Sequence, residues 1–90
     1  MSEPGERARG HGRHAVTLLT RAGCHLCEQA RLPLAAICAE TGAELREIDV
    51  DTDNDLRAEY GDRVPVFLVD GREHGYWRVE PERLRAALTA

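Results

Sequence analysis

The chain has no lysine, so arginine supplies all 12 of its cationic side chains, and 16 carboxylates outnumber them to give a net charge of −4. Proteins that bind nucleic acid generally show a basic excess, so this composition excludes a general nucleic-acid binder. Long apolar runs are also absent. Runs such as Ala15–Leu19 and Val64–Val69 have the length of strands, whereas a membrane span needs about 20 residues. We therefore expect neither a nucleic-acid partner nor a membrane partner.

Cysteine is scarce. The chain has three cysteines, an odd number with one close pair, whereas small secreted domains held together by disulfides use more. Residues 1–14 contain arginine and glycine but no apolar segment, and so they do not resemble a secretory signal. Both observations favour a cytoplasmic location. In that reducing compartment a lone C-x-x-C motif indicates redox or metal chemistry.

The length of 90 residues is enough for one domain, since a second core would need roughly 50 more residues. Residues 1–14 hold too few apolar side chains to pack, and we predict a disordered N-terminal tail there. The predicted folded domain covers residues 15–90.

Strand and helix patterns alternate along this domain. Strands are predicted at residues 15–20, 45–50, 64–69 and 72–78. Helices are predicted from His25 to Thr41, from the Asp51–Asp53 cap to Gly61, and from Pro81 onward. The Asp70–Gly71 pair predicts a tight hairpin between the last two strands. A right-handed crossover makes the first two strands parallel neighbours. The prediction is an α/β fold of order β-α-β-α-β-β-α, with a four-stranded mixed sheet and helices on both faces.

Side-chain burial can be predicted from the same patterns. In the first helix, apolar residues recur at three- and four-residue steps and predict one buried face, made of Leu26, Ala30, Leu34, Ile37, Cys38 and Thr41. On this face Cys38 is expected to act as a small buried apolar residue rather than a redox group. Trp77, on the last predicted strand, is expected to be half-buried core rather than a binding platform.

Cys24 and Cys27 form a C-x-x-C motif directly after the first predicted strand, at the start of the first predicted helix. A helix N-terminus carries about half a positive charge and several unpaired N–H groups, and both stabilise a thiolate. Cysteines in such motifs have pKa values lowered from about 8.5 toward about 3.5–7.5. Cys24 lies just outside the first turn, so it is the candidate nucleophile, and Cys27 is the more covered partner. A protonated His25, and Arg21 upstream, would lower the pKa of Cys24 further.

The placement of these residues resembles the thioredoxin fold, and the short form that begins with the strand–helix unit looks like the glutaredoxins. Thr20–Cys27 is similar to their strand-to-active-site segment, and Asp62–Val66 is similar to their proline loop. The resemblance covers about Ala15 to Leu88. Together with Tyr76–Trp77 it is closest to small bacterial glutaredoxin-like proteins, and it implies a minimal glutaredoxin-like version of the thioredoxin fold.

The resemblance also implies a function and a site. The chain would be a thiol–disulfide oxidoreductase with Cys24 as nucleophile and Cys27 as resolving thiol. Pro65 would follow a cis bond and face the cysteines, and the backbone of Val64 would pair with an extended substrate. Arg21 falls where glutaredoxins often hold a basic residue for a glutathione carboxylate.

Partners follow from the same resemblance. The substrate would be a disulfide-containing protein or a small thiol disulfide, and the electron donor a reductase or a thiol pool. No cofactor is expected, apart from glutathione or another low-molecular-weight thiol as reductant, and the chain is expected to be a monomer. One segment departs from the family: glutaredoxins usually have a Gly-Gly pair after the hairpin, and residues 72–80 offer only Gly75.

Two other readings of the cysteines stay open. Metal sites also use C-x-x-C, but Cys38 lies 11 residues after Cys27, about 16 Å along an intact helix. It cannot share a metal with the pair inside one monomer, so we expect no metal ligands there. A non-enzymatic module that holds a metal, or an iron–sulfur cluster shared between two subunits, is the alternative to an enzyme. A scaffold whose cysteines are idle is the other.

Overall fold

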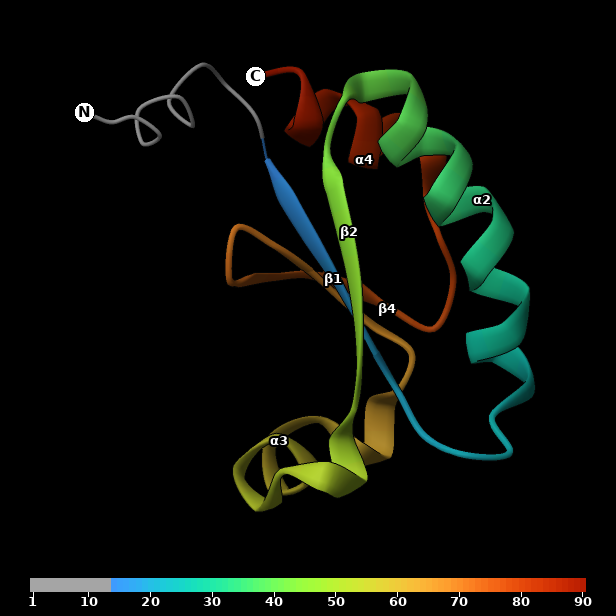
Figure 1. Ribbon diagram of the computed structural model, residues 1–90, viewed down its shortest axis with the longest axis vertical. Helices are drawn as coiled ribbons and strands as arrows, with labels where there is room; N and C mark the ends of the chain where they lie inside the picture. The colour runs from blue at the N-terminus through green and yellow to red at the C-terminus, as the bar shows by residue number, and fades with distance from the viewer. Residues whose placement is uncertain (1–13) are drawn as a thin grey trace.

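A four-stranded mixed sheet organises the fold in the computed structural model, which describes residues 14–90 (Figure 1). The strands are β1 (Ala15–Thr20), β2 (Glu44–Asp49), β3 (Val66–Val69) and β4 (Arg72–Tyr76), in the spatial order β2-β1-β3-β4. β1 runs parallel to β2 and antiparallel to β3, and β3 is antiparallel to β4. This arrangement confirms the predicted fold class. Apart from His14, the tail predicted for residues 1–14 lies outside the described residues.

Three α-helices connect or follow the strands: α2 (His25–Thr41), α3 (Asn54–Tyr60) and α4 (Pro81–Leu88). Two short 3₁₀ turns, η1 (Val50–Thr52) and η2 (Gly61–Arg63), flank α3. The bounds of α2 agree with the prediction. Gly42 ends the helix with a φ of 76°, a left-handed conformation that glycine adopts readily. No helix within residues 14–90 is both long enough and apolar enough to cross a bilayer.

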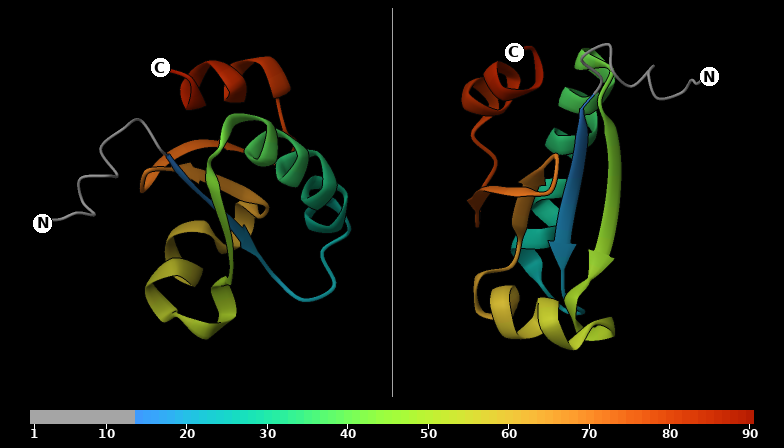
Figure 2. Two further views of the ribbon diagram at one scale, coloured as in Figure 1. Left: turned by 45° about the horizontal axis from the view of Figure 1, so that its top comes forward. Right: turned by 90° about the vertical axis from the view of Figure 1, so that its left-hand side faces the viewer.

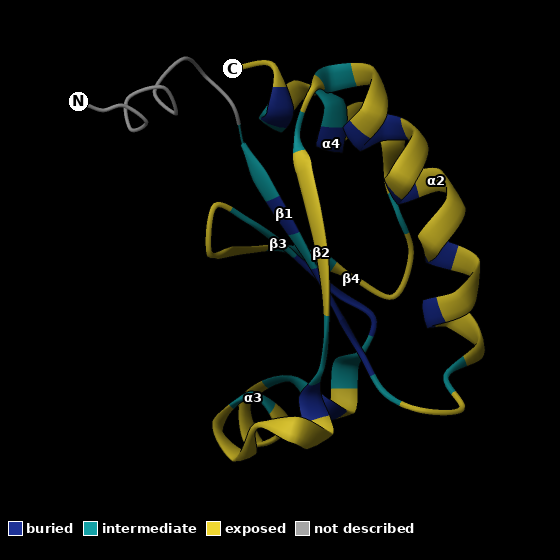
Figure 3. Cartoon of the chain, viewed as in Figure 1, coloured by how far each residue is buried: buried dark blue, intermediate teal, exposed yellow. Residues whose placement is uncertain are grey.

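Buried side chains form two clusters, one on each face of the sheet. Figure 3 shows buried residues recurring along α2 between exposed ones. The larger cluster lies against α2 and α4 and contains Val16, Leu18, Ala30, Leu34, Ile37, Cys38, Phe67, Leu84 and Leu88. The smaller contains Leu19, Val50 and Val66 and is bordered by Leu56 and Tyr60 of α3. α3 lies at the end of the sheet where β1 ends (Figure 2). Helices therefore cover both faces, as predicted.

The ends of three predicted strands differ in the structure. β2 runs from Glu44 to Asp49 instead of over residues 45–50, because Val50 begins η1. β3 begins at Val66 and not at Val64, since Pro65 has no N–H to give to a ladder. β4 ends at Tyr76 because Trp77 adopts a left-handed conformation with φ 74°, which cannot continue a strand. The hairpin between them is as predicted: Asp70 and Gly71 have φ values of 53° and 85°, the pattern of a tight two-residue turn.

Two burial predictions were wrong. Leu26 is 45% exposed although it fits the apolar period of α2. The reason is its position in the first turn, where the next residue, Cys27, faces the interior and is only 1% exposed. Trp77 is 53% exposed, because the left-handed backbone ends the strand before the tryptophan.

His14, the last residue of the predicted tail, is part of the fold. Its carbonyl oxygen accepts a hydrogen bond from the N–H of Glu44 at 2.9 Å, and its ring contacts the carboxylate of Asp70. The hydrogen bond between the His14 ring and Asp70 raises the pKa of His14. The pKa of Asp70 is lowered, chiefly by the hydrogen bond from the backbone N–H of Ala15 and then by the one with His14. His14 is therefore tied to β2 and to the hairpin by hydrogen bonds.

Candidate functional site

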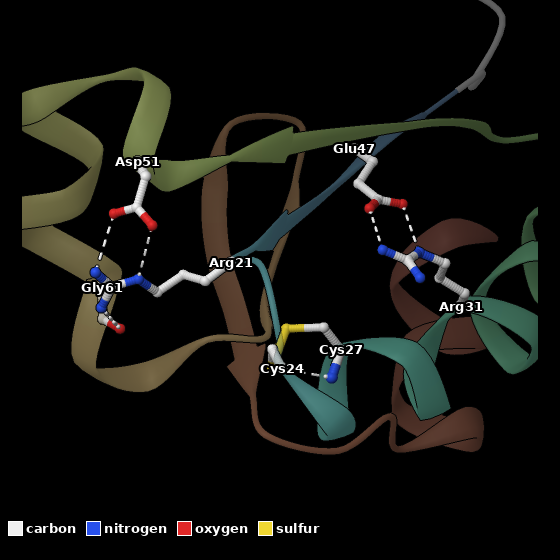
Figure 4. Close-up of a disulfide and its surroundings, with 7 residues drawn as sticks. All are labelled: Arg21, Cys24, Cys27, Arg31, Glu47, Asp51 and Gly61. Atoms are coloured by element: carbon white, nitrogen blue, oxygen red, sulfur yellow. Dashed lines mark hydrogen bonds and ion pairs between the residues drawn. A yellow bond between two sulfur atoms is a disulfide. The ribbon is translucent and has the colours of Figure 1, made fainter.

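The two cysteines of the motif lie where β1 leads into α2. Gly23, with φ 75°, makes the turn out of the strand. Cys24 is then the N-cap of α2, and Cys27 stands in its first turn. Their Cα atoms are 5.2 Å apart and their sulfur atoms form a disulfide (Figure 4). The local fold thus holds both sulfurs at the N-terminus of the longest helix, as the sequence predicted.

Burial distinguishes the two cysteines. Cys24 is partly exposed, whereas Cys27 is buried. The sulfur of Cys24 accepts a hydrogen bond from the backbone N–H of Cys27 at 3.1 Å. This donor and the positive end of the helix dipole would stabilise a thiolate on Cys24 when the disulfide is reduced. Of the two cysteines, Cys24 is therefore the one that solvent reaches.

Val64 and Pro65 lie at the same end of the sheet as the cysteines. Leu19 of β1 pairs with Val66 of β3, so Pro65 stands near the end of β1, from which the chain runs to Cys24. The Val64–Pro65 bond is cis, as the resemblance implies, and Pro65 is fully buried. Its carbonyl oxygen accepts a hydrogen bond from the N–H of Trp77 at 2.8 Å. Pairing of Val64 with a substrate stays a prediction.

Arg21 connects the loop before the cysteines to the α3 region. Its Nε and Nη2 atoms donate to the two carboxylate oxygens of Asp51 at 3.2 and 3.0 Å, and Nη1 donates to the carbonyl oxygen of Gly61 at 3.3 Å (Figure 4). The hydrogen bonds that Arg21 donates to Asp51 raise the pKa of Arg21. The guanidinium therefore anchors the loop to η1 and η2. A role in binding a substrate carboxylate stays a prediction.

His25 is the first residue of α2 and is exposed. It follows Cys24 directly in the sequence, and its side chain is exposed to solvent. The proposed effect of His25 on the pKa of Cys24 stays a prediction.

Sequence reasoning missed an apolar groove at the start of α2. It has a volume of about 270 Å³ and lies between the start of α2 and the segment that joins β4 to α4. Its apolar lining consists of Leu26, Ala30, Pro33, Trp77, Val79 and Pro81; we call it the Leu26–Trp77 groove. Leu26 stands between the two cysteines in the sequence, so the groove begins at the motif itself. In the sequence, the only indication of this groove was Trp77, the single tryptophan of the chain.

Cys38 lies apart from this site, in the larger core cluster, where it is 3% exposed. Burial raises the pKa of its thiol. A raised pKa keeps the group as an unreactive thiol at neutral pH, and the core excludes reagents. The structure thus places Cys38 as the sequence predicted, as a small buried apolar side chain.

We expect Cys38 to react with iodoacetamide far more slowly than the cysteines of the motif. In reduced protein at pH 7.5, mass spectrometry of peptides after timed alkylation should show Cys24 modified first and Cys38 last. In denaturant the three rates should converge, because burial no longer protects Cys38. Fast labelling of Cys38 in the folded protein would contradict its place in the core.

Among residues 14–90, no group of three or more His, Cys, Asp or Glu side chains is arranged to hold a metal ion.

Comparisons with known proteins place this geometry in context. A family model described as "Glutaredoxin-like domain (DUF836)" matches residues 15–89. Uncharacterized proteins of Mycobacterium tuberculosis and Mycobacterium bovis are 53% identical over 79 residues, which cover 82% of this chain and 81% of theirs.

Solved structures share the fold. Protein Ne2328 from Nitrosomonas europaea is 28% identical with a TM-score of 0.73, over 82% of this chain and 89% of that one. Protein XcR50 from X. campestris is 37% identical with a TM-score of 0.59, over 81% and 93%. A thioredoxin from Halobacterium salinarum, 19% identical with a TM-score of 0.63 over 98% and 84%, shows the fold alone.

Proposed function

Since this chain belongs to the glutaredoxin-like domain family (DUF836), we propose that it is a thiol–disulfide oxidoreductase that reduces disulfides of proteins or of low-molecular-weight thiols. One observation carries the proposal: an accessible Cys24 sulfur caps the N-terminus of α2, with the buried Cys27 sulfur within bonding reach behind it. An accessible, stabilised thiolate with a covered second thiol is the arrangement that disulfide exchange needs.

The reaction proceeds by two exchanges. The Cys24 thiolate attacks one sulfur of the substrate disulfide, and a mixed disulfide forms while the other substrate sulfur leaves as a thiolate and takes up a proton. Cys27 then gives up its proton and attacks the Cys24 sulfur. The second substrate sulfur leaves and is protonated. Two electrons have passed to the substrate, and the protein holds the Cys24–Cys27 disulfide.

A separate donor returns the protein to the dithiol. In our proposal this donor is a thiol such as glutathione, or a reductase, in a reducing cytoplasm, and the chain works as a monomer. Val64 would pair its backbone with the extended substrate beside Pro65, Arg21 would attract a substrate carboxylate, and His25 would lower the pKa of Cys24. No metal or other cofactor takes part in these steps.

A redox titration tests this function. Purified protein is equilibrated in buffers of oxidised and reduced dithiothreitol, free thiols are alkylated, and the mass of each cysteine peptide is measured. We expect one two-electron transition confined to Cys24 and Cys27, with a potential between about −270 and −200 mV, the range of thioredoxins and glutaredoxins. A pair that forms no disulfide, or that is held by a metal after purification, would overturn the proposal.

A further inference from the structure

The Leu26–Trp77 groove is a feature that the proposed reaction leaves unused. It is apolar along most of its lining, and its wall begins at Leu26, between the two cysteines. Its volume of about 270 Å³ is close to the lower end of ligand pockets, which are roughly 300–1,000 Å³. A site of this size fits one or two side chains rather than a whole cofactor.

Trp77 is held in an unusual way on the groove wall. Its φ of 74° is one of only two positive values for non-glycine residues among residues 14–90, and the other belongs to the hairpin residue Asp70. The backbone around Trp77 is fixed by its hydrogen bond to Pro65 and by a bond from the N–H of Arg78 to the carbonyl oxygen of Tyr76, 3.0 Å long. Such strain concentrates at binding and catalytic sites.

This backbone conformation leaves the indole ring of Trp77 exposed to solvent. The Tyr76 ring packs edge-on against it, with centroids 5.0 Å apart, so the indole has a fixed orientation although it is 53% exposed. A rigid, exposed aromatic ring beside an apolar wall is characteristic of residues that dominate binding at interfaces.

Arg78 adds a charge to the groove. It lines the groove, and within the described part of the chain its guanidinium has no hydrogen bond or ion pair. Two other arginines near the disulfide are engaged. Arg21 is held by Asp51, and Arg63, next to Val64, donates to Glu73 at 2.7 Å. Among the residues that line the groove, Arg78 is the charged one, and it is open to a carboxylate of a ligand.

We propose that the Leu26–Trp77 groove binds an apolar side chain next to the reacting cysteine of an extended protein substrate, with Arg78 pairing with an acidic residue of the same segment. The proposal rests on the proposed function, because it names the substrate class of the same site. A polar low-molecular-weight disulfide such as that of glutathione has no apolar side chain to cover the lining. A polypeptide supplies the apolar group, the carboxylate and the cysteine together.

Three synthetic disulfides separate the substrate class from the reaction itself. In the first peptide, leucines flank the cysteine on both sides and a glutamate follows; in the second, serines replace the leucines. Hydroxyethyl disulfide is too small to fill the groove. We expect kcat/KM of the wild-type protein to favour the leucine peptide over the serine peptide by at least about tenfold.

Variants show whether the groove is the cause. Trp77→Ala should bring the ratio of the two peptide rates close to one, and Arg78→Gln should lower the rate for the leucine peptide only while its glutamate is present. Leu32→Ala is the matched control, because Leu32 is an exposed leucine of α2, 80% accessible, outside the groove. It should leave all three rates unchanged. Equal wild-type rates for the two peptides, or a preference that survives Trp77→Ala, would overturn the proposal.

A binding measurement keeps the proposal separate from catalysis. Since Trp77 is the only tryptophan, its fluorescence reports on the groove. Titration with the leucine peptide, its cysteine replaced by serine, should give a saturable shift to shorter emission wavelength, and the serine peptide should give none. If the shift appears while hydroxyethyl disulfide is not reduced, the groove stands and the proposed function fails. If hydroxyethyl disulfide is reduced and no shift appears, the proposed function stands and the groove proposal fails.

Discussion

The Cys24→Ser variant is expected to lose all disulfide reductase activity, down to the rate of the uncatalysed exchange. A serine hydroxyl is not ionised near neutral pH and cannot attack a disulfide. The loss should be chemical and not structural, because a serine oxygen can accept the hydrogen bond from the N–H of Cys27 that the Cys24 sulfur now accepts. The measurement is turnover of a fluorescent peptide disulfide with dithiothreitol as donor, beside circular dichroism to establish the fold.

Two companion variants make this prediction specific. Cys27→Ser should complete the first exchange and stop at the mixed disulfide, which a mass increase equal to one substrate thiol identifies. Cys38→Ala is the control: it removes the third thiol from the core, and it should keep the wild-type rate. Activity in the Cys24→Ser variant, or an equal loss on replacing Cys38, would show that the exchange does not begin at Cys24.

Leu34→Ala should produce the largest loss of stability among simple truncations of α2. Leu34 is fully buried in the core cluster between α2 and the sheet. Removing a buried leucine side chain in this way costs about 2–5 kcal/mol, since apolar contacts are lost and a cavity remains. Domains are typically stable by only about 5–15 kcal/mol, so one truncation removes a substantial part of the free energy of unfolding.

The control for this change lies two residues away. Leu32 has the same side chain in the same helix but is 80% exposed, and Leu32→Ala should change stability by less than about 0.5 kcal/mol. Urea unfolding followed by circular dichroism gives both values. Similar midpoints for the two variants would mean that α2 does not pack on the sheet through Leu34.

Much of the fold could be predicted from the sequence because its signals are local. The helix His25–Thr41 has an N-cap, an apolar period and a terminating glycine, and all three agree on its bounds. The Asp70–Gly71 turn is equally local, since both residues readily adopt positive φ. Two predicted strands were too long. The third included Pro65, which has no N–H, and the fourth included Trp77, whose positive φ cannot be predicted from the residue pattern.

The site could be predicted only in part. The position of Cys24 and Cys27 at a helix N-terminus follows from the order of strand and helix. The exposure of Leu26 does not, because the period of an amphipathic helix does not tell where the helix runs past the sheet. The groove is formed by side chains from α2 and from the segment after β4, so only tertiary packing brings Leu26 and Trp77 together. Arg21 is similar: its partner Asp51 lies on the far side of β2 in the sequence.

The unequal sharing of the core between the helices has a consequence for how this chain tolerates mutation. α2 buries five residues and α4 buries two, whereas α3 contains no buried residue. Substitutions on the outer surface of α3 should therefore have little effect on the packing around the cysteines. Substitutions on the inner surface of α2 should affect that packing directly, because the cysteines lie at the N-terminus of α2. We expect most tolerated substitutions to occur in α3. Substitutions at the buried positions of α2 should be the ones that most often prevent folding.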